Sequence, residues 1–199
     1  MKLGLSYPYS VGTILPFDEY KRYDDTIFVF GDSFAEVGSV PVDDLIKTWL
    51  EMLAHSLSFN VRSFGVGGSS QQLIFDIFNK TLKLKRVFTI IFHTNPARHD
   101  RYNLKPLPFL KYSDYKKWDS LLNEKTLHIF RDKEHQVYDF KNGKTHYCPN
   151  WKNSKTNLNV QYKKYEKVAG SNHMTYYGNL LLTKDIVEII GDELRFNNE

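Results

Sequence analysis

The chain has 199 residues, of which 41% are hydrophobic and 25% charged, and this length and composition suit one domain spanning residues 1–199. The single cysteine, Cys148, excludes an internal disulfide and a zinc site built on cysteines. No apolar stretch reaches the length of a membrane span, and Met1–Pro8 lacks the apolar core of a signal peptide. These features predict a soluble, cytoplasmic protein, and the richness in lysine and tyrosine also suits a virion-associated one.

The net charge of +4 is distributed unevenly along the chain. Residues 101–167 contain 15 Lys and Arg against 7 Asp and Glu, together with 12 of the aromatic residues. Two interpretations are open for this segment: a solvated, lysine-rich surface insertion, or a surface that attracts an anionic or sugar-like partner. Nucleic acid is disfavoured as a partner because no nucleic-acid-binding motif accompanies the charge.

The first half of the chain alternates predicted strands with predicted helices. Ile27–Phe30 is a continuous apolar run, typical of a strand covered on both faces, and Gly31-Asp32-Ser33 follows it. Apolar residues at spacings of three and four, among them Leu45, Ile46 and Trp49, predict an amphipathic helix over Val42–Leu57. A short strand over Asn60–Phe64 then ends in a turn rich in glycine and serine.

A second helix is predicted after this turn, with Ser69 and Gln72 forming a capping box at its start. Val87–Phe92 reads as a third buried strand, because it is rich in β-branched and aromatic residues. Strands that alternate with helices imply right-handed βαβ units and a parallel sheet.

The second half of the chain is less regular. The pair Asn142-Gly143 predicts a β-hairpin inside the basic, aromatic-rich insertion, between residues 137–140 and 145–148. The remaining predictions are a helix over 113–122, a strand over 126–130, a polar loop over 151–164 and a final amphipathic helix from Tyr176.

Residues suited to acyl transfer follow the predicted strands. Ser33 lies just past the first strand, and Gly68 lies at a helix entrance, where its backbone N–H is free to face an anion. Asn95 supplies an amide just past the third strand, and His173 precedes the final helix. A nucleophile, two oxyanion donors and a base are the groups that ester hydrolysis requires.

In this order and context, Gly31-Asp32-Ser33, Gly68, Asn95 and His173 resemble the sequence blocks of the SGNH (GDSL-type) hydrolases. The resemblance covers most of the chain, although residues 101–167 match no block. It implies an α/β fold, a flavodoxin-like three-layer α/β/α sandwich with a central parallel sheet. It also implies hydrolysis of an ester or thioester that requires no metal and no organic cofactor.

The resemblance assigns a role to each matching residue. Ser33 would attack the acyl carbon, and His173 would take its proton and return it to the leaving alcohol. The oxyanion hole would consist of the backbone N–H groups of Ser33 and Gly68 and the side-chain amide of Asn95.

Two departures from the family pattern concern the histidine and the third block. The family has an aspartate three residues before the histidine, where this chain has Gly170. A backbone carbonyl is the favoured acceptor for orienting His173, with Glu166 and Asp139 as alternatives. In the third block, His93 and Pro96 replace a glycine-rich approach and an aspartate, which predicts a reshaped pocket wall with His93 lining it.

The leading hypothesis is a serine esterase that removes a small acyl group, such as an O-acetyl group on a carbohydrate. The first rival is a catalytically inactive SGNH scaffold that binds glycans or has a structural role, for instance in a virus. The second rival is an acyltransferase that uses the same serine. A simpler interpretation makes Ser33 a helix cap and Asp32 a turn-organising acid.

Overall fold

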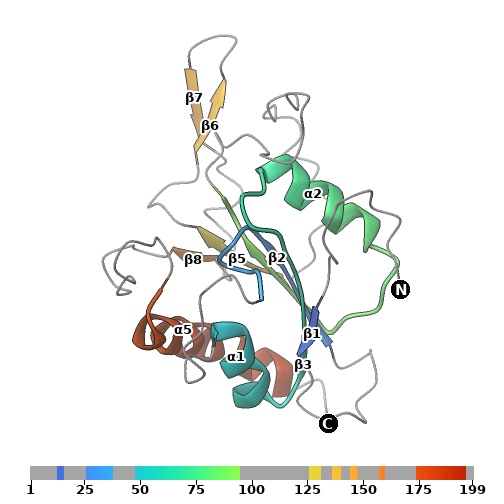
Figure 1. The fold of residues 1–199 in the computed structure, drawn as a ribbon, viewed down its shortest axis with the longest axis vertical. Coiled ribbons are helices and arrows are strands. Elements are labelled where there is room, and N and C mark those ends of the chain that lie inside the picture. The colour runs from blue at the N-terminus through green and yellow to red at the C-terminus, as the bar shows by residue number, and fades with distance from the viewer. Residues whose placement is uncertain are drawn as a thin grey trace.

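The structure is a computed structural model, and it describes residues 13–15, 26–37, 48–94, 126–130, 136–139, 144–147, 157–159 and 174–195. Its main sheet comprises β1 (Thr13–Leu15), β2 (Thr26–Gly31), β3 (Asn60–Gly65), β4 (Phe88–Phe92), β5 (Thr126–Phe130) and β8 (Asn157–Asn159). The spatial order of these described strands is β1-β3-β2-β4-β5-β8 (Figure 1).

Five of the described strands run parallel. The parallel pairs are β3 with β2, β2 with β4, β4 with β5, and β5 with β8, whereas β1 pairs antiparallel with β3 at the edge. Counted along the chain, the parallel strands lie in the order second, first, third, fourth, fifth, which is the flavodoxin-like order. The predicted parallel sheet is therefore confirmed, and its strand order reverses between β2 and β4.

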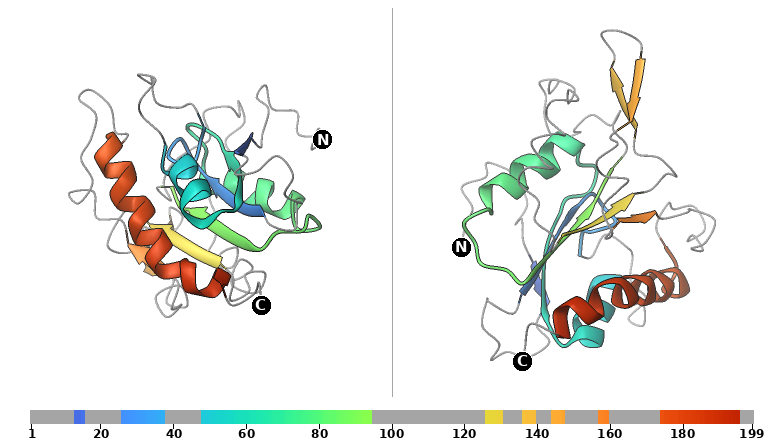
Figure 2. Two further views of the ribbon diagram at one scale, coloured as in Figure 1. Left: turned by 90° about the horizontal axis from the view of Figure 1, so that it is seen from below. Right: turned by 180° about the vertical axis from the view of Figure 1, so that it is seen from behind.

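Helices cover both faces of the sheet. Helices α1 (Trp49–Leu57) and α5 (Tyr176–Arg195) lie together on one face, and α2 (Gln71–Lys80) lies on the other (Figure 2). The three-layer sandwich expected from the resemblance is thus the observed architecture. Among the helices that the structure describes, none is both long and apolar enough to cross a membrane.

The two faces of the sheet have different cores, because successive strand residues point to opposite sides. On the face covered by α1 and α5, the cluster is mainly aliphatic and includes Ile27, Val29, Ile90, Leu182 and Ile186. The opposite face is aromatic, with Phe30 5.0 Å from Phe64 and 5.3 Å from Phe78 of α2, measured between ring centroids. Burial on both faces explains why β2 is a continuous apolar run.

Helix α1 begins later than the apolar pattern predicts. Its N-cap is Thr48, whose hydroxyl accepts from the Glu51 N–H, while the Glu51 carboxylate accepts from the Thr48 N–H at 2.7 Å. Because this capping box places the N-cap at Thr48, α1 starts at Trp49, and the predicted start at Val42 is wrong. Leu45 and Ile46, counted in the apolar pattern, precede the helix.

The cap of α2 is also displaced from its predicted position. Ser70, not Ser69, is the N-cap, and its hydroxyl accepts from the Leu73 N–H at 3.2 Å. Ser69 is fully buried and donates instead to the Gly31 carbonyl at 3.3 Å. The predicted capping box at Ser69 and Gln72 is therefore wrong, because a contact with β2 uses the first serine.

The second half of the chain contains one strand that was predicted as loop. Residues 157–159 form β8, a three-residue edge strand on β5, within the polar segment 151–164. Strands β6 (Gln136–Asp139) and β7 (Lys144–Tyr147) pair antiparallel around the Asn142-Gly143 segment. The strand over 126–130 and the helix from Tyr176 are confirmed, and the helix predicted over 113–122 lies outside the described residues.

The start of α5 is fastened to the start of α1 by one side chain. The Asn179 amide oxygen accepts from the Trp49 N–H at 3.0 Å, and its nitrogen donates to the carbonyls of Met174 at 3.4 Å and Thr175 at 2.9 Å. Because the backbone N–H can only donate and the carbonyls can only accept, this orientation of the amide is the only one that satisfies all three groups.

The turn after β2 passes directly over the end of β3 at Gly65. A Cβ atom at this position would overlap the backbone of Ala35 and Glu36. The Ser63 hydroxyl donates to the Ala35 carbonyl at the same place. Only glycine therefore lets the two backbones approach this closely.

Asn179→Asp should lower the free energy of unfolding by about 1–3 kcal/mol, because the carboxylate accepts from Trp49 but faces the Met174 and Thr175 carbonyls without a donor. Urea denaturation at neutral pH measures this loss. The deficit should shrink in acid, where the new carboxyl group regains a proton to donate. A variant as stable as the wild type at neutral pH would contradict this account of the junction.

Gly65→Ala should lower the free energy of unfolding by about 3 kcal/mol, since the overlapping atoms belong to the backbone and cannot rotate away. The matched control is Gly191→Ala in α5, where a Cβ would lie 3.8 Å from Leu57 and Val187, an ordinary contact. That control should stabilise the protein by about 0.4–1 kcal/mol. Thermal unfolding of the two variants should therefore move in opposite directions.

Candidate functional site

Ser33 lies in the turn that directly follows β2. It is half-buried, between Asp32 and Phe34, which are buried. The Ala35 N–H donates to the Asp32 carbonyl at 2.9 Å, and the Phe34 N–H donates to the Asp32 carboxylate at 3.1 Å. The Trp49 indole N–H donates to the Phe34 carbonyl at 2.7 Å. The backbone on both sides of Ser33 is therefore held in place.

Asp32 joins this turn to the end of β4. Its side chain is 0% exposed, and its second carboxylate oxygen accepts from the Thr94 hydroxyl at 2.9 Å. One carboxylate thus connects the strand ends on the two sides of the point where the strand order reverses. In open α/β sheets, ligands bind outside the carboxyl ends of strands at such a point.

Gly68 lies in the turn after β3 and has a φ of 77°, a left-handed conformation that favours glycine. The turn is tied to β2, because the Gly31 carbonyl accepts from the Val66 N–H at 3.1 Å and from the Ser69 hydroxyl. The residue itself is only partly buried. Its position after β3 places it beside the turn that contains Ser33.

His93 at the end of β4 is buried, with 1% of its surface exposed, and both of its ring nitrogens have hydrogen-bond partners on neighbouring elements. Its Nδ1 lies 3.0 Å from the Gln71 amide nitrogen, and its Nε2 lies 2.8 Å from Nδ1 of His128 in β5. Gln71 also accepts from the Thr94 N–H at 3.2 Å. His93 is therefore a buried ring that is hydrogen-bonded to neighbouring elements, and its place in a pocket wall stays a prediction.

Gln71 and His128 were not singled out from the sequence. His128 occupies an apolar strand, Thr126–Phe130, in which a histidine must find a polar partner if its ring is buried. A histidine in the middle of this strand was the available signal. Gln71 directly follows Ser70, the observed cap, and had no signal of its own.

The pKa of the His128 imidazole is lowered from 6.5 to about 3, because burial disfavours the charged ring. His128 is therefore neutral near pH 7. Its ring stacks nearly parallel to that of His93, with an interplanar angle of 10° and a centroid separation of 5.2 Å. Strand β5 thus contributes an uncharged imidazole to the polar cluster.

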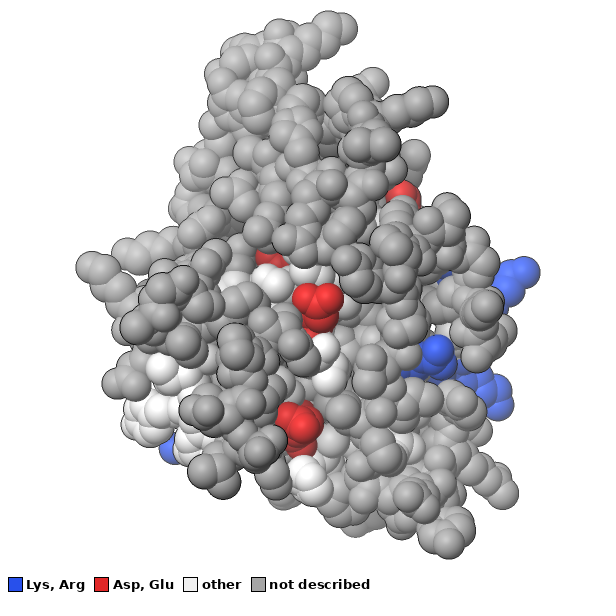
Figure 3. Space-filling view, viewed as in Figure 1, with Lys and Arg blue, Asp and Glu red and all other residues white. Residues whose placement is uncertain are grey.

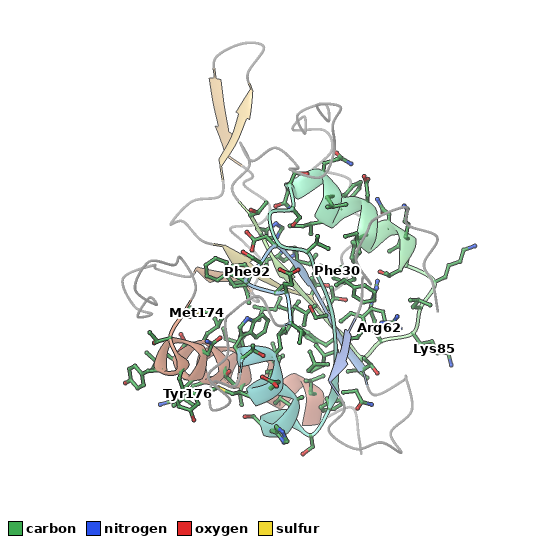
Figure 4. The ribbon with its side chains drawn as sticks, viewed as in Figure 1. Phe30, Arg62, Lys85, Phe92, Met174 and Tyr176 are labelled. Atoms are coloured by element: carbon green, nitrogen blue, oxygen red, sulfur yellow. The ribbon has the colours of Figure 1, made fainter. Side chains whose placement is uncertain are left out.

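Three of the predicted site residues lie outside the described part of the chain: Asn95, His173 and Glu166. Two of these are chain neighbours of described residues, since Asn95 follows Thr94 and His173 precedes Met174. Met174 is buried just before α5, and Figure 4 labels it and Phe92 in the left half of the view. The structure thus brings together the turns of Ser33 and Gly68 with the end of β4.

No three His, Cys, Asp or Glu side chains converge into a possible metal site within the portion of the molecule that the structure describes. The polar groups near the strand ends are instead engaged with one another. Phe34 stacks on Phe92, with ring centroids 5.4 Å apart, so the residue that follows Ser33 is part of the apolar core cluster.

Acid should destabilise the protein through His128. Above pH 6.5 neither the folded nor the unfolded chain binds a proton there, whereas between about pH 6.5 and 3 only the unfolded chain does. The free energy of unfolding should therefore fall by up to about 1.4 kcal/mol per pH unit in this window. His128→Asn keeps an acceptor at the δ position and cannot titrate. Urea denaturation at several pH values should give this variant a shallower decline, and equal slopes would contradict the assignment.

The comparisons with known proteins find a likeness in structure. No family model matches the chain, and no curated protein matches its sequence. The structure is similar to the crystal structure of a member of the lipolytic protein G-D-S-L family from Veillonella parvula, with a TM-score of 0.51 and 18% sequence identity. The match covers 83% of this chain and 98% of that one. It supports the resemblance to the SGNH (GDSL-type) hydrolases, and this chain has their fold.

Proposed function

We propose that this chain is a serine esterase of the SGNH type, with Ser33 as its nucleophile. The observation that carries the proposal is the position of Ser33, half-buried just past the carboxyl end of β2, where the strand order reverses. The fold shared with a G-D-S-L lipolytic protein supports the same assignment. Hydrogen bonds on either side of Ser33 hold the turn, so the hydroxyl needs little reorganisation before it attacks.

The proposed oxyanion hole uses the strand ends that flank β2. Its donors are the backbone N–H groups of Ser33 and Gly68 and the side-chain amide of Asn95. Gly68 follows β3, and Asn95 follows Thr94 at the end of β4. Donors fixed before the reaction stabilise the negative charge that forms when the hydroxyl oxygen adds to the acyl carbon.

His173 is the proposed base. It takes the Ser33 proton as the hydroxyl attacks, and returns it to the leaving alcohol as the acyl-enzyme forms; a water molecule then releases the acid by the same route. Met174, the next residue, is held at its carbonyl by Asn179. Gly170 replaces the usual aspartate, so a backbone carbonyl is the proposed acceptor for the second imidazole nitrogen, with Glu166 and Asp139 as alternatives.

The proposed substrate is a small acyl ester, and O-acetyl groups on a carbohydrate fit best. This choice rests on the excess of basic and aromatic residues over 101–167. In the view of Figure 3, most of the described basic side chains that can be seen lie at the right edge, where Figure 4 places Lys85 before β4, and one lies at the lower left. The insertion is the proposed source of attraction for an anionic or sugar-like substrate at Ser33.

A non-catalytic scaffold is the second candidate, and Gly170 is the observation that favours it. Without a carboxylate, the histidine loses a group whose replacement by an amide can cost about 10⁴ in turnover. Such a protein would bind glycans or assemble with other molecules without turning over esters. An acyltransferase using Ser33 is the third candidate, in which an alcohol replaces water as the acyl acceptor.

Ser33→Ala should abolish labelling by a fluorophosphonate probe and lower p-nitrophenyl acetate hydrolysis by at least about a thousandfold. The reason is that the variant has no oxygen nucleophile at the strand end. The matched control is Ser56→Ala, which removes an exposed hydroxyl from α1 and should leave labelling and turnover unchanged.

The same assay separates the three candidates. A wild-type protein that neither reacts with the probe nor hydrolyses acetyl esters would overturn the esterase proposal in favour of the scaffold. Transfer of the acetyl group to an added alcohol faster than to water would indicate the acyltransferase. A panel of acetylated sugars and polysaccharides then identifies the leaving group.

A further inference from the structure

The side chain of Gln71 lies between the strand ends that would provide the two further oxyanion donors. Gln71 is the first residue of α2, three residues after Gly68, and it reaches to Thr94 and His93 at the end of β4. Its side chain is 2% exposed. The turn after β3 and the chain at the end of β4 are thus connected by a buried side chain as well as through the sheet.

The hydrogen-bond directions in this cluster follow from Thr94. Its backbone N–H can only donate, so the Gln71 atom that it meets is the amide oxygen. The Gln71 nitrogen therefore donates to Nδ1 of His93, which must be unprotonated. A neutral His93 then carries its proton on Nε2 and donates to Nδ1 of His128, which leaves the His128 proton on Nε2.

This relay has no alternative direction that leaves every bond intact. Reversing the Gln71 amide would set its nitrogen against the Thr94 N–H, two donors facing each other, and would require the Nδ1–H tautomer of His93. All four residues are at most 5% exposed, so water is poorly placed to repair a broken bond. The Thr94 N–H therefore fixes the rotation of the Gln71 amide, and the amide in turn fixes the tautomers of His93 and His128.

Thr94 is held from two sides as a result. Gln71 accepts from its backbone N–H, and Asp32 accepts from its hydroxyl at 2.9 Å. Asn95, the next residue, is the proposed oxyanion donor. The position of Thr94 restricts the position of the Asn95 Cα atom, because consecutive Cα atoms are about 3.8 Å apart.

We infer that Gln71 is a positioning residue, which sets the Asn95 amide relative to the Gly68 N–H by holding Thr94, while His93 accepts from its amide nitrogen. This inference rests on the proposed esterase function. Gln71 touches no reacting atom. Its contribution appears when the oxyanion forms, since donors must lie within about 2.7–3.1 Å of that charge.

The kinetic test is Gln71→Met, which keeps a long side chain but cannot accept from Thr94 or donate to His93. We expect kcat for p-nitrophenyl acetate to fall about 100-fold with KM nearly unchanged, because misplaced donors weaken the transition state more than substrate binding. Fluorophosphonate should still label Ser33, although more slowly. Gln72→Met is the matched control: its amide donates to Asp76 on the same helix at 2.8 Å, away from the strand ends, so kcat should not change.

The structural test reads the imidazole protons directly by ¹⁵N NMR, with signals assigned through His93→Asn and His128→Asn. Wild-type protein should show both histidines as neutral Nε2–H tautomers. Gln71→Glu accepts from Thr94 but cannot donate, so His93 should become protonated at Nδ1. An Nδ1–H tautomer at either histidine in the wild type would overturn the relay, whatever the catalytic activity.

The outcomes separate this inference from the proposed function. An active wild type whose Gln71→Met variant keeps its kcat, or loses only substrate affinity, would overturn the positioning role alone. A wild type with the expected tautomers but without labelling or turnover would overturn the esterase proposal, and with it the role of Gln71 in catalysis. Correct tautomers together with a selective loss of kcat would support both.

Discussion

Asp32 carries a carboxylate that is wholly buried at the carboxyl end of β2, where a charge without partners would cost several kcal/mol. Its two oxygens accept from the Phe34 N–H and the Thr94 hydroxyl, so the turn after β2 and the end of β4 must adopt compatible positions. Ser33 lies between Asp32 and Phe34 in the chain. The side chain proposed as nucleophile is therefore placed by the hydrogen bonds of its neighbours.

Close backbone approach is the second constraint on the strand ends. Gly31 and Gly65 both lack room for a Cβ, which at Gly31 would lie 2.8 Å from the Cβ atoms of Ala35 and Phe92. Trp49 adds a bond from its indole to the Phe34 carbonyl and, through its backbone N–H, contacts Asn179. The chain segment that follows His173 and the turn that contains Ser33 are thus fastened to the same residue of α1.

The central elements were predictable because each has a strong local pattern. Strand β2 is a continuous apolar run since helices cover both of its faces. Strands β1 and β8 were not predicted because each is three residues long and lies at a sheet edge. Backbone pairing with one neighbour is enough to form such a strand, so its sequence carries no clear pattern. The cap of α2 was misplaced by one residue because Ser69 bonds to Gly31, which leaves Ser70 as the cap.

For the candidate site, the sequence by itself determined which residue types follow which strands: Ser33 after β2, Gly68 after β3 and Thr94-Asn95 after β4. Local pattern suffices for this because apolar runs and glycine-rich turns are properties of neighbouring residues. Only the tertiary structure decided that Thr94 is held by both Asp32 and Gln71, and that His93 meets His128 across two strands. These partners are 23 to 62 residues apart along the chain, and they meet because parallel strands bring their carboxyl ends to one edge of the sheet.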